Sequence, residues 1–92
     1  MLNLIADYKL NGVWMHQALQ MFGTDNEQMA AQAAVAKLTM SGCVPLAIHR
    51  IYGDYTLQQL SEMNDGAAPH RLIWCDEGRL RAALAADRLP AE

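Results

Sequence analysis

The sequence has few cysteines, few aromatic side chains, few charges and no long apolar run. Two of its 92 residues are cysteine, and aromatic and charged residues make up 7% and 18% of the chain. A disulfide framework needs more cysteines in a small chain, so we expect Cys43 and Cys75 to be reduced. No apolar run approaches the roughly 20 residues of a membrane span, and the N-terminus lacks the basic start and long apolar run of a signal peptide. We therefore expect a cytoplasmic protein that does not enter a membrane.

The charge balance is mildly acidic, with a formal net charge of −3. Affinity for nucleic acid depends on cations that neutralise phosphates, so this charge balance argues against a nucleic-acid partner. The candidate metal ligands occur singly rather than in the close-set pairs of structural zinc sites, and we expect no metal or cofactor. They are His16, Cys43, His49, His70 and Cys75.

What the sequence does contain is enough apolar material for one folded domain. The apolar fraction is 52%. A chain of this size buries roughly 60–65% of its unfolded surface, which suffices for a modest core. We therefore treat residues 1–92 as a single domain.

The first 22 residues predict a β-hairpin. Residues 2–10 alternate between apolar and polar side chains, which is typical of a half-buried strand. Asn11-Gly12 follows, the dipeptide that favours a type I′ turn. Residues 13–22 can be interpreted as a helix or a strand. A two-residue turn pairs apolar with apolar residues along one face, which favours the strand. The predicted pairs are Leu10 with Val13, Tyr8 with Met15, Leu4 with Leu19 and Leu2 with Met21.

Residues 24–41 predict a helix with two apolar stripes. Thr24 and Glu27 have the spacing of a capping box, and Gly42 is placed to end the helix. One stripe contains Met29, Ala33, Ala36 and Met40, and we expect it to lie on the hairpin. The other contains Ala31, Ala34, Val35 and Leu38. We expect this second stripe to face the C-terminal helix or a partner chain.

The rest of the chain predicts alternating short elements. These are a strand at 44–52, a helix at 56–63 capped by Thr56 with Gln59, a strand at 71–75, and residues 79–89. The last segment can be a strand, but its alanines and a cap at Asp76 favour a helix. The order is then ββαβαβα. The predicted class is α+β: the hairpin and at least one further strand form a mainly antiparallel sheet, packed on one face by the helix at 24–41. A mostly α fold is the alternative.

The function that the sequence favours is a non-enzymatic protein–protein interaction or regulatory module that self-associates. Large apolar residues on the outer hairpin face and on the second helix stripe would make the interface. We expect a homodimer and an unidentified protein partner. The interface candidates are Trp14, His16, Phe22, Val35, Leu38 and Trp74.

The sequence is also compatible with two other functions. Residues 56–75 resemble the middle of a helix-turn-helix, which implies a nucleic-acid-binding regulator, although Asn64 and Asp65 depart from that motif at the turn. An enzyme or small-ligand carrier with an unrecognised pocket is the other. Asp7 and His16 are predicted cross-strand neighbours, but no serine or cysteine is placed to act as their nucleophile, so we assign no catalytic residue.

Overall fold

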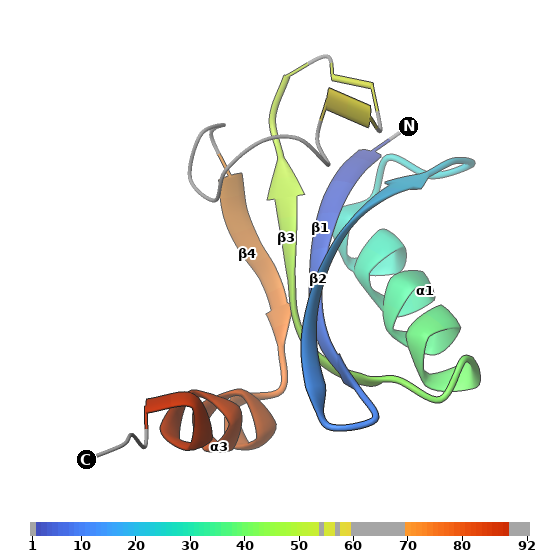
Figure 1. Ribbon diagram of the computed structural model, residues 1–92. Coiled ribbons are helices and arrows are strands. Elements are labelled where there is room, and N and C mark those ends of the chain that lie inside the picture. Colours follow the sequence, from blue (N-terminus) through green and yellow to red (C-terminus); the bar gives the residue numbers. More distant parts are fainter. Residues whose placement is uncertain (1, 54, 57, 60–69, 89–92) are drawn as a thin grey trace.

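The computed structural model describes residues 2–53, 55, 56, 58, 59 and 70–88. Within them, four strands form one antiparallel sheet in the order β2-β1-β3-β4, with a helix against each side (Figure 1). The elements are β1 (Leu2–Leu10), β2 (Val13–Met21), α1 (Glu27–Met40), β3 (Val44–Ile51), β4 (His70–Cys75) and α3 (Glu77–Arg88). The predicted α+β class and its antiparallel sheet are confirmed.

The N-terminal hairpin has the predicted register. Asn11 and Gly12 adopt φ angles of 53° and 80°, the positive values that a type I′ turn requires at both central residues. The strands then pair without a shift from Leu10 opposite Val13 to Leu2 opposite Met21. Residues 13–21 are therefore a strand, and the helical interpretation of this segment is wrong.

Helix α1 begins later than predicted. Asn26 is its N-cap, and the Asn26 side chain accepts a hydrogen bond from the backbone N–H of Met29. Thr24 lies two residues outside, where its hydroxyl oxygen accepts from the N–H of Asn26. The predicted capping box of Thr24 and Glu27 is wrong because Glu27 is already the first helical residue and its carboxylate is bound elsewhere.

The helix also lies on the sheet by the opposite stripe from the one predicted. Its buried residues are Ala30, Ala31, Ala34 and Leu38. Val35 packs beside them against the core formed with Leu2, Leu4, Ala6, Tyr8 and Ile48. Met29 and Met40 point away and are 60% and 88% exposed. The small alanines let the helix backbone approach the sheet closely, whereas methionines on that face would hold it away.

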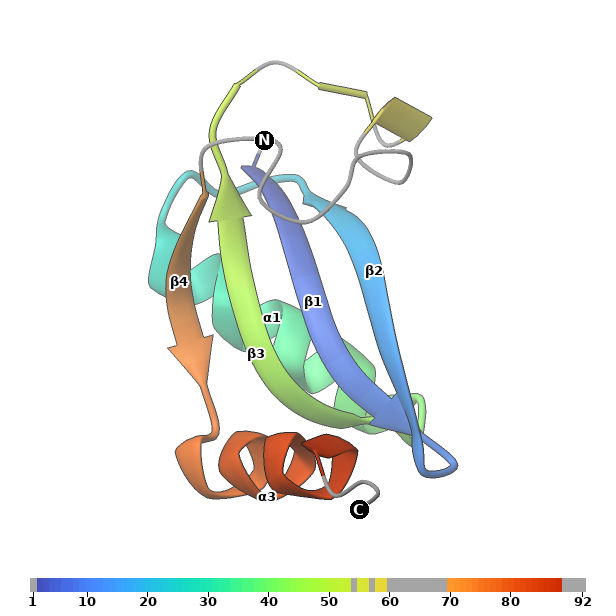
Figure 2. The ribbon, with the colours of Figure 1, turned by 60° about the vertical axis from the view of Figure 1, so that its left-hand side comes forward.

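On the other side of the sheet, the parts of the chain that the structure describes provide cover at the two ends. Helix α3 lies on the side opposite α1, at the end where β3 begins (Figure 2). Asp76 caps this helix, as predicted, because its side chain accepts a hydrogen bond from the N–H of Arg79. Residues 79–88 belong to the helix, so the strand alternative for this segment is wrong. At the other end, the buried side chain of Asn3 donates to the carbonyl oxygens of Gly53 and Tyr55, both at 3.4 Å.

The predicted helix at 56–63 lies largely outside the described residues. Its predicted cap is present: the Thr56 N–H donates to the Gln59 side chain, and the Gln59 N–H donates to the Thr56 hydroxyl. This reciprocal pair is a capping box.

The orientation of α1 makes a direct prediction. Ala34→Leu adds three carbons to the packed face and should lower the free energy of unfolding by about 1–3 kcal/mol. Ala36→Leu makes the same change on the exposed face and should alter it by no more than about 0.5 kcal/mol. Urea denaturation of both variants measures this. Equal effects, or the reverse order, would show that α1 lies on the sheet by its other stripe.

Candidate functional site

Strand β2, at one edge of the described sheet, presents an apolar row that is only partly covered. Helix α1 packs mainly over β1, β3 and β4. The residues of β2 on the helix side of the sheet are therefore only partly covered. Val13 is 59% exposed and Met15 is 38% exposed, while Leu19 and Met21 are half-buried against the core. Phe22, directly after the strand, is 72% exposed.

Strand β2 also lacks the features with which proteins protect a sheet edge. Its sequence, VWMHQALQM, contains no lysine, arginine, acid, proline or glycine. Its nine residues pair with β1 without a bulge. Proteins usually interrupt an exposed edge with charge, proline, a bulge or a very short strand, because an unprotected edge pairs with other strands. The edge of β2 is therefore suited to pairing with another chain.

The turn determines which backbone groups of β2 point outward. In a two-residue hairpin the residues flanking the turn form a hydrogen-bonded pair, so the backbone groups of Val13 are directed to β1. Because this bonding alternates along an antiparallel pair, the odd-numbered residues face β1. The N–H and C=O groups of the even-numbered residues, such as Trp14, Ala18 and Gln20, are directed to the outer edge.

The opposite edge of the sheet, β4, is different. It is six residues long, contains Arg71, and its pairing with β3 shifts register between Ile48 and His49. Both the charge and the irregular pairing are protective features. The two edges are therefore unequal, and β2 is the one whose sequence and pairing lack these protective features.

The six residues predicted for an interface divide into two groups. Trp14, His16 and Phe22 lie on β2 or directly after it. Val35 and Leu38 lie on the face of α1 that packs against the sheet of their own chain, and Trp74 packs against the same core. The prediction that the Val35 and Leu38 stripe faces the C-terminal helix or a partner chain is wrong. Both stripes of α1 are apolar, so the sequence alone does not distinguish the stripe that packs against the sheet from the one that is exposed.

A polar cluster occupies the face of the sheet away from α1. Asp7 Oδ1 accepts a hydrogen bond from Trp14 Nε1 at 3.3 Å and lies 2.5 Å from His16 Nδ1. Asp7 Oδ2 lies 3.9 Å from His49 Nδ1. The rings of His49 and His70 meet edge to face at 5.5 Å. One carboxylate thus joins β2, β1 and β3, and the predicted pairing of Asp7 with His16 is confirmed.

This cluster links three strands through the Asp7 carboxylate. Among the described residues there is no group of three or more histidine, cysteine, aspartate or glutamate side chains arranged to hold a metal ion. Cys43 and Cys75 are free, half-buried thiols, one just before β3 and the other at the end of β4. The cluster lies on the face of β2 rather than at its edge, so it leaves strand pairing at that edge unobstructed.

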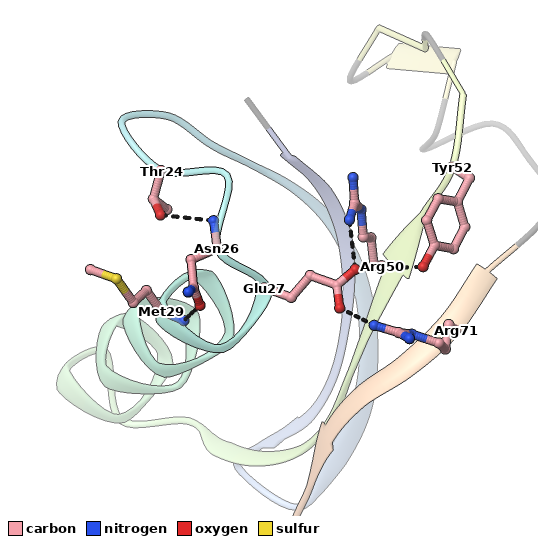
Figure 3. Close-up of polar contacts among 7 residues, drawn as sticks. All are labelled: Thr24, Asn26, Glu27, Met29, Arg50, Tyr52 and Arg71. Atoms are coloured by element: carbon pink, nitrogen blue, oxygen red, sulfur yellow. Dashed lines mark hydrogen bonds and ion pairs between the residues drawn. The ribbon is translucent and has the colours of Figure 1, made fainter.

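A second polar cluster ties the start of α1 to the sheet (Figure 3). Glu27 Oε2 lies 2.6 Å from Arg50 Nη1, and Glu27 Oε1 accepts from Arg71. The Tyr52 hydroxyl donates to the same carboxylate at 3.5 Å, and its ring lies 4.8 Å from the Arg50 guanidinium carbon. Arg71 is therefore part of a strand and of an ion pair. The helix-turn-helix resemblance of residues 56–75 implies that His70 and Arg71 lie on a helix, and this is wrong because both belong to β4.

The two arginines stabilise the charged form of Glu27. The hydrogen bond from Arg50 is the main cause that lowers the pKa of Glu27 below its ordinary value of 4.5, the charges of Arg71 and Arg50 lower it further, and partial desolvation opposes them. A carboxyl group whose pKa is lowered by folding stabilises the folded protein above its unfolded pKa. This contribution disappears as the pH falls through the lowered value.

Glu27→Gln should therefore lower the urea midpoint at pH 7, and its difference from the unsubstituted protein should shrink as the pH falls below about 4.5. Urea titrations between pH 7 and pH 2.5 measure this. Glu77→Gln is the control, because Glu77 is exposed in the first turn of α3, and its effect should be smaller. A Glu27→Gln difference that stays constant down to pH 2.5 would contradict the assignment.

A hollow of about 380 Å³ lies between the hairpin turn, the start of β3 and α3. Its lining is mainly apolar, with two cationic side chains. The lining residues are Lys9, Asn11, Gly12, Gly42, Val44, Leu46, Arg79, Ala82 and Ala83. Arg79 lies 3.7 Å from the Asp76 carboxylate, so its charge is partly compensated.

Sequence reasoning missed Val13 and Met15 as surface residues. It placed them on the inner face of the hairpin, which is the correct face, and expected a helix to cover them. Their exposure follows from the strand order. Strands β3 and β4 extend the sheet beyond β1, on the side away from β2, and α1 packs over β1, β3 and β4. The uncharged composition of β2 was the available signal that this strand differs from an ordinary protected edge.

No protein-family model, no curated protein and no solved structure matches this chain. None of the helices in the described parts of the chain has the length and apolar character needed to cross a membrane.

Proposed function

We propose that this protein is a non-enzymatic interaction module that self-associates, and that its binding surface is the edge of β2. The observation that carries this proposal is an edge strand of nine residues that is regular, uncharged and flanked by exposed apolar side chains. Strand addition at such an edge gains backbone hydrogen bonds and buries the side-chain rows on both faces. The free thiols Cys43 and Cys75 are in keeping with a cytoplasmic location.

Features elsewhere in the chain favour this function over its rivals. Arg50 and Arg71 are bound to Glu27, which reduces the positive charge available for phosphate contacts. The polar cluster around Asp7 joins three strands, a sufficient structural reason for its presence. An interaction module requires neither a basic surface nor a reactive group.

The competing surface for self-association is the exposed stripe of α1 that contains Met29 and Met40. It is apolar, but it is one residue wide along most of its length and its central members are alanines. Alanine offers little area to bury, whereas an edge strand adds hydrogen bonds to apolar contact. The edge of β2 is therefore the stronger surface of the two.

Matched methionine-to-lysine substitutions separate these two surfaces. The unsubstituted protein should show twice the mass of one chain by light scattering at micromolar concentration. Met15→Lys places a charge on the edge strand and should shift the protein to a single chain, because lysine is a natural edge protector. Met29→Lys makes the same change on the exposed stripe of α1 and should leave the pair intact.

Circular dichroism should show that both variants remain folded, since Met15 and Met29 are exposed. The measurement should extend to about 100 µM, roughly a hundredfold above the micromolar concentration at which association is expected. A protein that remains a single chain over this whole range would refute self-association. Dissociation by Met29→Lys with no effect of Met15→Lys would place the interface on α1 instead.

A further inference from the structure

We propose that β2 pairs with β2 of a second copy in one antiparallel register, with Gln17 of each copy on the twofold axis. This inference rests on the proposed function, because it specifies the partner strand and its alignment at the same surface. A twofold interface uses the same patch on both copies, so the strand must be complementary to itself.

The hairpin first restricts the registers that hydrogen bonding allows. The even-numbered residues of β2 direct their backbone groups to the edge, as the turn determines. In an antiparallel pair, residues directly opposite each other are either both hydrogen-bonded or both not. Even-numbered residues must therefore lie opposite even-numbered residues of the second copy. Every register that places an even residue opposite an odd one is excluded.

Among the allowed registers, the one centred on Gln17 pairs the whole strand. All nine residues of β2 then have a partner, whereas a shift of the axis by one residue in either direction leaves two of them unpaired. About eight backbone hydrogen bonds form, two for each of the four pairs of even-numbered residues.

The side chains also match best in this register. On the helix side, Val13 lies opposite Met21 of the second copy and Met15 opposite Leu19, so apolar residues face apolar residues. Gln17 lies opposite Gln17, an amide pair on the axis. On the other face, the pairs are Trp14 with Gln20 and His16 with Ala18. No pair brings like charges together.

The neighbouring registers are worse by the same criteria. If the axis passes through His16, two imidazoles lie directly opposite each other and Gln17 faces Met15. If it passes through Ala18, Gln17 faces Leu19. Both place an amide against an apolar side chain. The Gln17 register avoids this and joins the two four-stranded sheets into one continuous sheet.

Opposite charges at position 17 test this register. Gln17→Lys and Gln17→Glu each place two like charges directly opposite one another, and each variant alone should show a dissociation constant raised about fivefold or more. An equimolar mixture should recover the association, because lysine then faces glutamate. Sedimentation of each variant and of the mixture measures the average mass. Recovery in the mixture also shows that neither variant fails to fold.

Cysteine at the same position gives a second readout. Residues opposite each other in a pair that is not hydrogen-bonded have Cα atoms about 4.5 Å apart, within the range that a disulfide spans. Gln17→Cys should therefore form a disulfide-linked pair under mild oxidation. Met15→Cys is the control, because its two copies would be four residues out of alignment, roughly 13 Å apart. The native cysteines are present in both variants and in the unsubstituted protein, which supplies the background.

The outcomes separate this inference from the proposed function. A monomeric unsubstituted protein would overturn both. A protein that self-associates, is insensitive to either charge at position 17 and is not cross-linked through Gln17→Cys would overturn the register and leave self-association in place. Cross-linking through Met15→Cys would show that the axis passes through that residue instead. Loss with each charge, recovery on mixing and a disulfide at position 17 alone are the results that we expect.

Discussion

The two-residue turn at Asn11-Gly12 is the constraint on which the rest of this structure depends. Both residues have positive φ angles, and the turn sets a register that continues unshifted to the end of the hairpin. The register places one apolar row on the side where α1 packs and places Asp7 beside His16 on the other side. It also determines which backbone groups of β2 point outward. A shift of one residue would exchange the two faces and reverse the direction of those groups.

The position of α1 explains why one edge of the sheet is left uncovered. Its alanine face packs closely over β1, β3 and β4, and the contacts of Glu27 with Arg50 and Arg71 hold its first turn to the strands on that side. A single helix of 14 residues is too narrow to cover four strands. Strand β2 therefore keeps an exposed apolar row beside an edge without protective charges. The same anchoring that stabilises the fold creates the surface that we assign to self-association.

The sequence predicted the hairpin, its register, the fold class and the caps at Thr56 and Asp76, because each depends on residues close together in the chain. It did not predict which stripe of α1 is buried. Both stripes are apolar, and only close packing of Ala30, Ala31 and Ala34 on the sheet distinguishes them. The exposed row at Val13 and Met15 also escaped prediction, because it depends on the order of strands far apart in the chain. Among the interface candidates, Trp14, His16 and Phe22 lie on β2 or directly after it, whereas Val35 and Leu38 pack in the core.

Amide hydrogen exchange along β2, compared between dilute and concentrated protein, tests the central claim most directly. In a single chain the amides of Met15 and Leu19 are protected by β1, while those of Ala18 and Gln20 point to the edge and exchange rapidly. We predict that concentrating the protein slows exchange at Ala18 and Gln20 and leaves Met15 and Leu19 protected throughout. Exchange at Ala18 and Gln20 that is equally rapid at every concentration would contradict the assignment of this edge as the binding surface.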